Sequence, residues 1–146
     1  MSVIDEMLDR IVSFSENIED YIRLEIIENE AIICDMNSET QLFEKGINAD
    51  GVSIESYAPY QPITKQIKLA KGQPTNRVTL RDTGEFHASF RVTAGESSFY
   101  IDATDWKAEK LTIGYGDDIF GLTDENINEL IWEYIYPMLI KKLEEI

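Results

Sequence analysis

The sequence predicts one α+β domain with a long N-terminal helix, a small antiparallel sheet that contains a hairpin, and a C-terminal helix kinked at a proline. Three observations indicate this fold class. Apolar residues recur at helical spacing near both ends of the chain, whereas residues 86–101 alternate between apolar and polar. A length of 146 residues is ordinary for a single domain and is sufficient to bury a hydrophobic core.

Residues 1–46 form the predicted N-terminal helical region. From the third residue onward the apolar side chains fall on one stripe at helical spacing, and Ser2 is placed to cap the start of the helix. An apolar-rich helical stretch continues beyond this stripe, with a break expected near Asn29 or Asn37. The region ends at Gly46, because glycine favours helix termination.

Residues 47–76 are predicted to be a loop-rich, basic connection. The segment is rich in Asn, Asp, Gly and Pro, which are typical of turns and irregular loops. A short helix is expected over Thr64–Ala70, and Gly72 and Pro74 stop it.

Residues 77–116 are predicted to hold the β-sheet. Alternation over 86–93 predicts a strand, 94–96 offer a turn, and 99–101 resume the alternation in a second strand. Residues 78–80 are a candidate third strand. The hairpin is therefore expected to have one covered and one solvated face.

Residues 121–146 form the predicted C-terminal helix. Thr123 can cap its start, and Asp124 and Glu125 follow in the first turn, where acidic side chains favour the positive end of a helix. Pro137 lies inside the apolar stripe and should kink the helix, because proline removes one backbone donor.

Charge is distributed unevenly along the chain, which carries a net charge of −15. Residues 1–60 hold 14 acidic and three basic residues, residues 61–91 hold two acidic and six basic, and residues 92–146 hold 12 acidic and four basic. This balance argues against a broad nucleic-acid-binding surface. The basic block in the middle could be an ordinary solvated surface, or it could meet the acidic surface of a second copy in a head-to-tail contact.

Tyrosines next to prolines precede this basic block, and both features suit an interface between subunits. The alternative is an ordinary packed loop. The predicted interface residues are Tyr57, Tyr60, Lys65, Lys68, Lys71, Arg77 and Arg81.

No set of residues in the sequence predicts catalysis, a cofactor or a metal ion. Asp82, Thr83 and Gly84 spell the aspartic-protease tripeptide, but a tight turn explains them equally and no second such site follows. The sole histidine, His87, is expected on the polar surface of the hairpin. The sole cysteine, Cys34, is expected to be a small buried side chain rather than a nucleophile, and an unpaired cysteine fits a reducing compartment.

Two further segments resemble parts of known binding motifs, but the residues next to them do not fit those motifs. Residues 48–51 resemble part of a calcium loop, but Tyr57 stands where the loop needs a glutamate. Residues 114–116 begin like a dinucleotide-binding loop, yet two aspartates follow where backbone amides should meet phosphate. No run of about 20 apolar residues and no signal pattern appear, so the sequence predicts a protein made in a cytosol.

Residues 39–146 resemble a family of small tailed-phage and prophage proteins common in Bacteroides-type hosts. The resemblance rests on the segments QLFEKGINADG, SYAPYQPITKQIKLAKGQPTNRVTLRDTGEFHASF and YGDDIFGLTDENINELIWEYIYPMLIKKLEEI. The pattern Leu80, Thr83, Gly84, Ser89 is also distantly similar to phage tail-completion and head-tail connector (neck) proteins.

This resemblance implies a non-enzymatic structural protein of the virion, made in the host bacterial cytoplasm. It implies a homo-oligomeric ring at the neck or tail, in contact with other neck, portal or tail proteins. DNA would pass nearby without specific binding, and an acidic inner wall would repel its phosphates. Two alternatives stay open: a soluble acidic binding protein that inhibits a partner by imitating DNA, and a minor enzyme such as a protease.

Overall fold

The computed structural model describes residues 2–146 and confirms the predicted α+β class. Within these residues a two-stranded antiparallel sheet accompanies a series of helices. In chain order the elements are α1 (Val3–Glu28), α2 (Glu30–Asp35), the π-helical η1 (Met36–Lys45), the 3-10 helix η2 (Ile54–Ser56), α3 (Pro62–Ala70), α4 (Glu85–Ala88), β1 (Phe90–Ala94), β2 (Phe99–Ala103), α5 (Ala108–Tyr115), the 3-10 helix η3 (Asp117–Ile119), α6 (Asp124–Leu130), the π-helical η4 (Ile131–Ile135) and α7 (Tyr136–Glu144).

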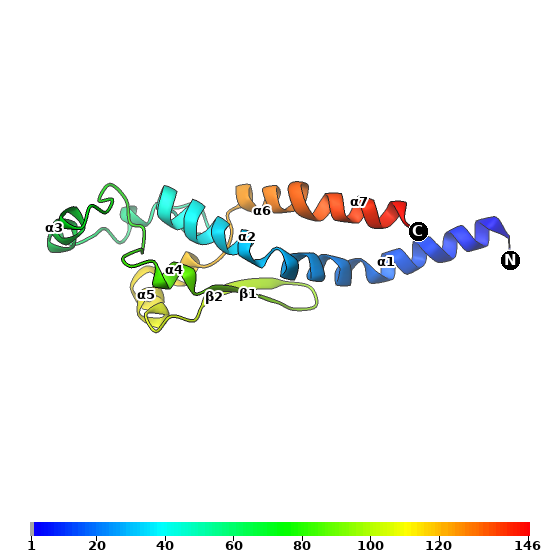
Figure 1. Cartoon of the computed structure of the whole chain (residues 1–146), viewed down its shortest axis with the longest axis horizontal. Coiled ribbons are helices and arrows are strands. Elements are labelled where there is room, and N and C mark those ends of the chain that lie inside the picture. The colour runs from blue at the N-terminus through cyan, green and yellow to red at the C-terminus, as the bar shows by residue number, and fades with distance from the viewer. Residues whose placement is uncertain (1) are drawn as a thin grey trace.

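The molecule is elongated along α1 (Figure 1). α1 runs between the C-terminal helices α6 and α7 on one side and the hairpin on the other. The first turns of α1 extend beyond the end of α7, whereas α3 lies at the opposite end of the molecule. The two ends of the long axis are therefore formed by different helices.

The N-terminal helical region begins and ends as predicted. Ser2 caps α1: its hydroxyl accepts a hydrogen bond from the backbone N–H of Asp5, and the Asp5 carboxylate accepts one from the backbone N–H of Ser2. The predicted break falls at Asn29, whose side chain donates to the carbonyl of Glu25 at 2.8 Å. Gly46 ends η1 with a φ of +64°, and a side chain there would crowd the neighbouring loop.

The β-hairpin forms, but it begins later than predicted. Phe90 pairs with Ala103 at one end of the sheet and Ala94 pairs with Phe99 at the other. The predicted turn is confirmed by a hydrogen bond from the Gly95 N–H to the Ser98 carbonyl at 2.7 Å. Residues 86–88 were expected in the first strand and instead form the short helix α4, because Gly84 turns the chain with a φ of +92°.

The predicted third strand at 78–80 is wrong. The backbone N–H of Thr79 donates to the hydroxyl of Tyr60 at 2.9 Å rather than to a neighbouring strand. Leu80 has a φ of +55°, which lies outside the range of a strand. The segment 77–116 therefore contains sheet only in β1 and β2, and its last part forms α5, which the sequence interpretation missed.

The C-terminal helix starts as predicted, with the Thr123 hydroxyl accepting from the backbone N–H of Asn126. Its course changes to π-helical geometry over Ile131–Ile135, directly before Pro137. Proline lacks the N–H that would complete a regular turn, and a π-helical turn is one way in which a helix accommodates this loss. The helical backbone continues through Pro137, and the kink expected at this proline stays a prediction.

The hydrophobic core runs along the inner side of α2, η1 and the hairpin. Cys34 is buried in it, as predicted. The buried apolar residues are Ile26, Ile33, Cys34, Met36, Leu42, Ile54, Val78, Leu80, Phe86, Phe90, Ile101, Ile119, Leu122, Leu130 and Ile135. None of them lies among residues 2–25, so the core supports only the later part of α1.

Candidate functional site

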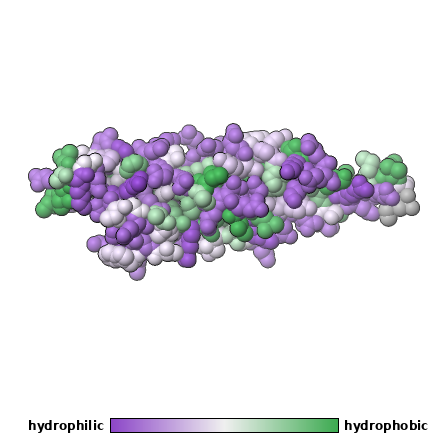
Figure 2. Space-filling view, in the orientation of Figure 1, coloured by the Kyte–Doolittle hydropathy of each residue, from purple (hydrophilic) through white to green (hydrophobic). Residues whose placement is uncertain are grey.

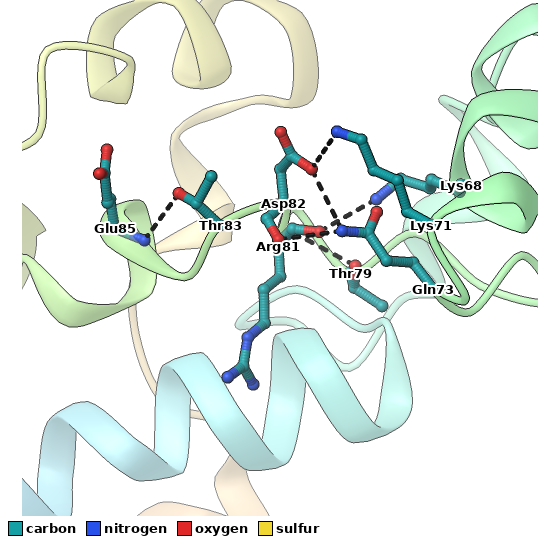
Figure 3. Close-up of polar contacts among 8 residues, drawn as sticks. All are labelled: Lys68, Lys71, Gln73, Thr79, Arg81, Asp82, Thr83 and Glu85. Atoms are coloured by element: carbon teal, nitrogen blue, oxygen red, sulfur yellow. Dashed lines mark hydrogen bonds and ion pairs between the residues drawn. The ribbon is translucent and has the colours of Figure 1, made fainter.

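The seven predicted interface residues lie in α3 and in the segments on either side of it, and most of them make contacts within the chain. Figure 3 shows Lys68, Lys71 and Arg81 among their polar contacts. Lys68 is only 8% exposed, and its ammonium donates to the Arg81 carbonyl at 3.0 Å. The same ammonium sits 4.8 Å from the centre of the Tyr60 ring, which is a cation–π distance. Lys68 and Tyr60 therefore hold the loop in place from inside.

The two arginines of the predicted interface fasten this loop to η1. Arg77 donates from Nε to the Phe43 carbonyl at 2.6 Å. Arg81 pairs with Glu39 at 3.1 Å, and its guanidinium lies 4.5 Å from the centre of the Phe43 ring. Both side chains thus serve the fold of the single chain.

The remaining three residues are partly accessible. Lys71 contacts the Asp82 carboxylate at 2.9 Å, and its hydrogen bond is the main cause that holds the pKa of Asp82 below its usual value. Lys65 lies 4.0 Å from Glu55. Tyr57 donates from its hydroxyl to the Tyr115 carbonyl at 2.9 Å while much of its ring stays exposed. These three side chains are therefore partly exposed at the surface, although each also contacts another residue of the chain.

The Asp82–Thr83–Gly84 tripeptide forms a turn. The Thr83 hydroxyl accepts from the Glu85 N–H at 3.3 Å, at the start of α4. One turn later, Ser89 donates to the Phe86 carbonyl at 2.8 Å and accepts from the Asp105 N–H at 3.0 Å. The threonine, glycine and serine of this pattern therefore build the corner that leads from the loop into the hairpin.

The prediction that His87 lies on the surface is wrong, because its side chain is only 6% exposed. Residues 86–88 are helical, so the imidazole turns inward and packs at 5.8 Å, ring centre to ring centre, from Phe90. Burial is the main cause that lowers the pKa of His87 from 6.5 to about 4, and the positive charge of Arg81 adds to it. The imidazole is therefore neutral at pH 7. It lines a cavity of about 170 Å³ beside Tyr115.

Exposed apolar side chains occur at both ends of the molecule, where Figure 2 shows hydrophobic residues, and also elsewhere on its surface, for example at Trp106, Ile113 and Trp132. At the N-terminal end they lie on the first three turns of α1 and are between 48% and 72% exposed. They are Val3, Ile4, Met7, Leu8, Ile11 and Val12. The sequence predicted one continuous apolar stripe along an amphipathic helix, but the structure covers only its part from Phe14 onward.

At the other end, α3 turns its apolar side outward. Ile63, Ile67 and Leu69 are between 50% and 67% exposed, whereas Lys68 is buried and Lys65 is partly buried. An amphipathic helix of a monomeric domain normally has the opposite orientation, with its apolar stripe facing the core. Helical spacing of Ile63 and Ile67 was visible in the sequence, but the inward direction of the lysines was not.

Other kinds of site were sought in the described part of the chain. Residues 2–146 contain no cluster of three or more His, Cys, Asp or Glu side chains that could hold a metal ion. Among the same residues no helix is both long and apolar enough to span a membrane. Burial raises the pKa of the Cys34 thiol to about 11, which disfavours a reactive thiolate. The exposed apolar ends are therefore the strongest candidate for a functional surface.

Comparisons of the chain with family models, with curated proteins and with solved structures returned no match. Function is accordingly inferred from the residues and their geometry.

Proposed function

We propose that this chain is a non-enzymatic structural protein of a tailed bacteriophage. Copies assemble as a ring at the neck or tail, as in a head-tail connector or a tail-completion protein, along the path of the DNA. The protein is made in the bacterial cytoplasm and ends up in the virion, where it contacts neck, portal or tail proteins.

The observation that carries this proposal is the unpartnered apolar surface at the two ends of the molecule. Six side chains on α1 and three on α3 are about half exposed or more. Single exposed apolar residues are common on monomers, but contiguous apolar stripes mark protein interaction sites. A subunit that is incomplete until it meets other subunits has this kind of surface.

The sequence pattern shared with connector proteins adds support. Thr83, Gly84 and Ser89 build one structural corner, so the pattern reflects a local fold rather than a catalytic centre. Asp82 is bound to Lys71, and this pairing stabilises the corner without a second carboxylate at hydrogen-bond distance. These contacts favour a structural protein over the protease alternative.

Net charge is consistent with a position beside DNA. At −15, the chain would repel phosphates wherever acidic side chains line a channel, which keeps a passing duplex from binding to the wall. A ring whose lumen proved neutral or basic would contradict this part of the proposal.

Peptide mapping of purified virions tests the proposed function directly. The phage or prophage that encodes the chain is induced, and heads, tails and complete particles are separated before digestion. We expect peptides of this protein in complete particles at a fixed ratio to the portal protein. Absence from virions, combined with a stable small oligomer in solution, would instead support the soluble DNA-mimic alternative.

A further inference from the structure

We infer that the assembly contact is head-to-tail: the first three turns of α1 of one copy dock on the outward apolar side of α3 of the next copy. This inference rests on the proposed function, since it presumes that copies of the chain assemble, and it names the two surfaces that meet.

The donor surface is the uncovered beginning of α1. Its apolar stripe continues the stripe whose later residues, from Phe14 onward, are partly covered by the rest of the chain. Ile146 lines a small pocket together with Met7 and Ile11, and the Ile146 carbonyl accepts a hydrogen bond from Nη1 of Arg10 at 3.5 Å. Beyond that point the helix projects into solvent (Figure 1). An amphipathic helix of this kind is suited to a complementary apolar surface.

The acceptor surface is the outer side of α3. Ile63 and Ile67 are one turn apart on the same side of this short helix, and both are at least half exposed, so this outer side is apolar. The helix cannot rotate to bury them, because Lys68 anchors its inner side to the Arg81 carbonyl. The apolar side is thus held outward by polar contacts within the chain.

Charge decides which surfaces pair. Residues 2–12 hold three acidic residues and one basic residue, whereas residues 54–84 hold two acidic and five basic residues. Two α1 ends brought together would set Asp5, Glu6 and Asp9 near their own copies, and two α3 ends would bring together Lys65 and Lys71, whose side chains remain partly exposed there. A contact of α1 with α3 sets opposite charges at the rim of an apolar centre, the usual arrangement of a specific interface.

The positions of the two surfaces fit this contact. They lie at opposite ends of the molecule, so one copy cannot cover its own exposed stripe (Figure 1). A contact between two different surfaces repeats from copy to copy, and it produces a closed ring when the rotation between copies closes. Each subunit would then donate one α1 and accept another.

Two variants, each lacking one surface, test the inference. The first carries Ile4→Glu and Leu8→Glu on α1, and the second carries Ile63→Glu and Ile67→Glu on α3. Native mass spectrometry and light scattering give the mass of each alone and of a one-to-one mixture, with one variant labelled with a heavy nitrogen isotope to separate their masses. All four positions are exposed, so circular dichroism should show an unchanged fold.

We expect each variant alone to be monomeric, with association weakened at least about 100-fold relative to the unaltered chain. The mixture should form a dimer that contains one copy of each variant, because it retains a single intact α1–α3 contact. Tyr100→Glu with Ile113→Glu, also at exposed positions, is the matched control and should assemble as the unaltered chain does.

Other outcomes overturn the inference and separate it from the proposed function. If the α3 variant alone forms dimers, α1 pairs with α1, and if the α1 variant alone does so, α3 pairs with α3. If both variants assemble normally, other surfaces form the ring and the proposed function stands. If the unaltered chain is monomeric at every concentration, the inference fails, and peptide mapping of virions decides the proposed function independently.

Discussion

The junction between η1 and α6 and the projecting end of α1 invert the usual relation between polarity and burial. At the junction, the polar side chains Asn37 and Gln41 are completely buried. At the end of α1, apolar side chains such as Ile4 and Leu8 are more than half exposed. The difference teaches that each region is explained by its partners: the polar side chains of the junction find theirs within the chain, whereas the apolar side chains at the end of α1 stay about half exposed or more.

The buried junction is a hydrogen-bond network that fixes the chain entering α6. Gln41 donates to the Gly121 carbonyl at 2.8 Å, and its side-chain oxygen accepts from the Thr123 N–H at 2.9 Å and from Asn126 at 2.7 Å. Asn37 donates to the carbonyl of residue 119 at 2.9 Å. Buried polar groups are tolerated when satisfied in this way, and they specify one arrangement of the elements.

The largest effect should come from breaking this network. Gln41→Ala leaves the Thr123 N–H and the Gly121 carbonyl without their partner in a buried site, and it leaves the Asn126 amide with only its longer hydrogen bond to the Met36 carbonyl at 3.4 Å. We expect the free energy of unfolding to fall by about 3 to 5 kcal/mol in urea titrations. Gln61→Ala, at an exposed glutamine that makes no capping hydrogen bond, is the control and should change stability little. A similar small loss for both variants would contradict the importance of the network.

Acid should destabilise the folded chain through the buried side chain of His87. The imidazole titrates near pH 6.5 when unfolded and near pH 4 when folded, so between these values the unfolded chain binds a proton that the folded chain excludes. The free energy of unfolding should therefore decrease as pH falls from 6.5 to 4, by up to about 3 kcal/mol.

Urea titrations of His87→Phe over the same pH range check this expectation, because the variant should lose most of that decrease. The lowered pKa of Asp82 affects stability only below its ordinary value of 3.8, so it does not obscure the window. An unchanged slope in the variant would show that His87 is not the group responsible.

A smaller effect is expected at the corner that joins the loop to α4. Gly84→Ala places a side chain at a φ of +92°, which costs about 1 to 2 kcal/mol although the space itself is open. Gly114→Ala is the matched control: it lies inside α5, nothing lies within 4 Å of the added atom, and it should stabilise by about 0.5 to 1 kcal/mol. Thermal unfolding of both variants measures the contrast, and equal shifts would contradict it.

The smallest effect on stability should come from removing the projecting region. A chain that lacks residues 2–12 should unfold within about 1 kcal/mol of the full chain, because every one of these residues is exposed. Assembly measured by light scattering should nevertheless be lost. A large loss of stability would show that the first turns of α1 belong to the monomer fold.

Much of the fold could be predicted from local patterns. Ser2, Gly46 and Thr123 act at helix ends, where the chemistry of capping depends on one or two neighbours. The first strand was predicted to begin too early because the spacing of Phe86 and Phe90 fits both the periodicity of a strand and that of a helix. They are four residues apart, so they share one side of a strand and also one side of a helical turn.

The candidate site was harder to predict because it depends on tertiary direction. The sequence predicted the region around α3 as an interface, yet it could not show that Lys68 points inward and Ile67 outward. Likewise, the apolar stripe of α1 is continuous in sequence, and only the structure shows that its residues before Phe14 are exposed. Whether an apolar stripe is core or interface is decided by what packs against it.

Native mass spectrometry of the unaltered full chain over a wide concentration range tests the central claim most directly. We expect a single limiting mass that is an integer multiple of the chain mass, because in a closed head-to-tail ring every α1 end and every α3 end is occupied. The mass of one chain at every concentration, or a mass that grows without limit, would contradict the assembly of this protein into a closed ring.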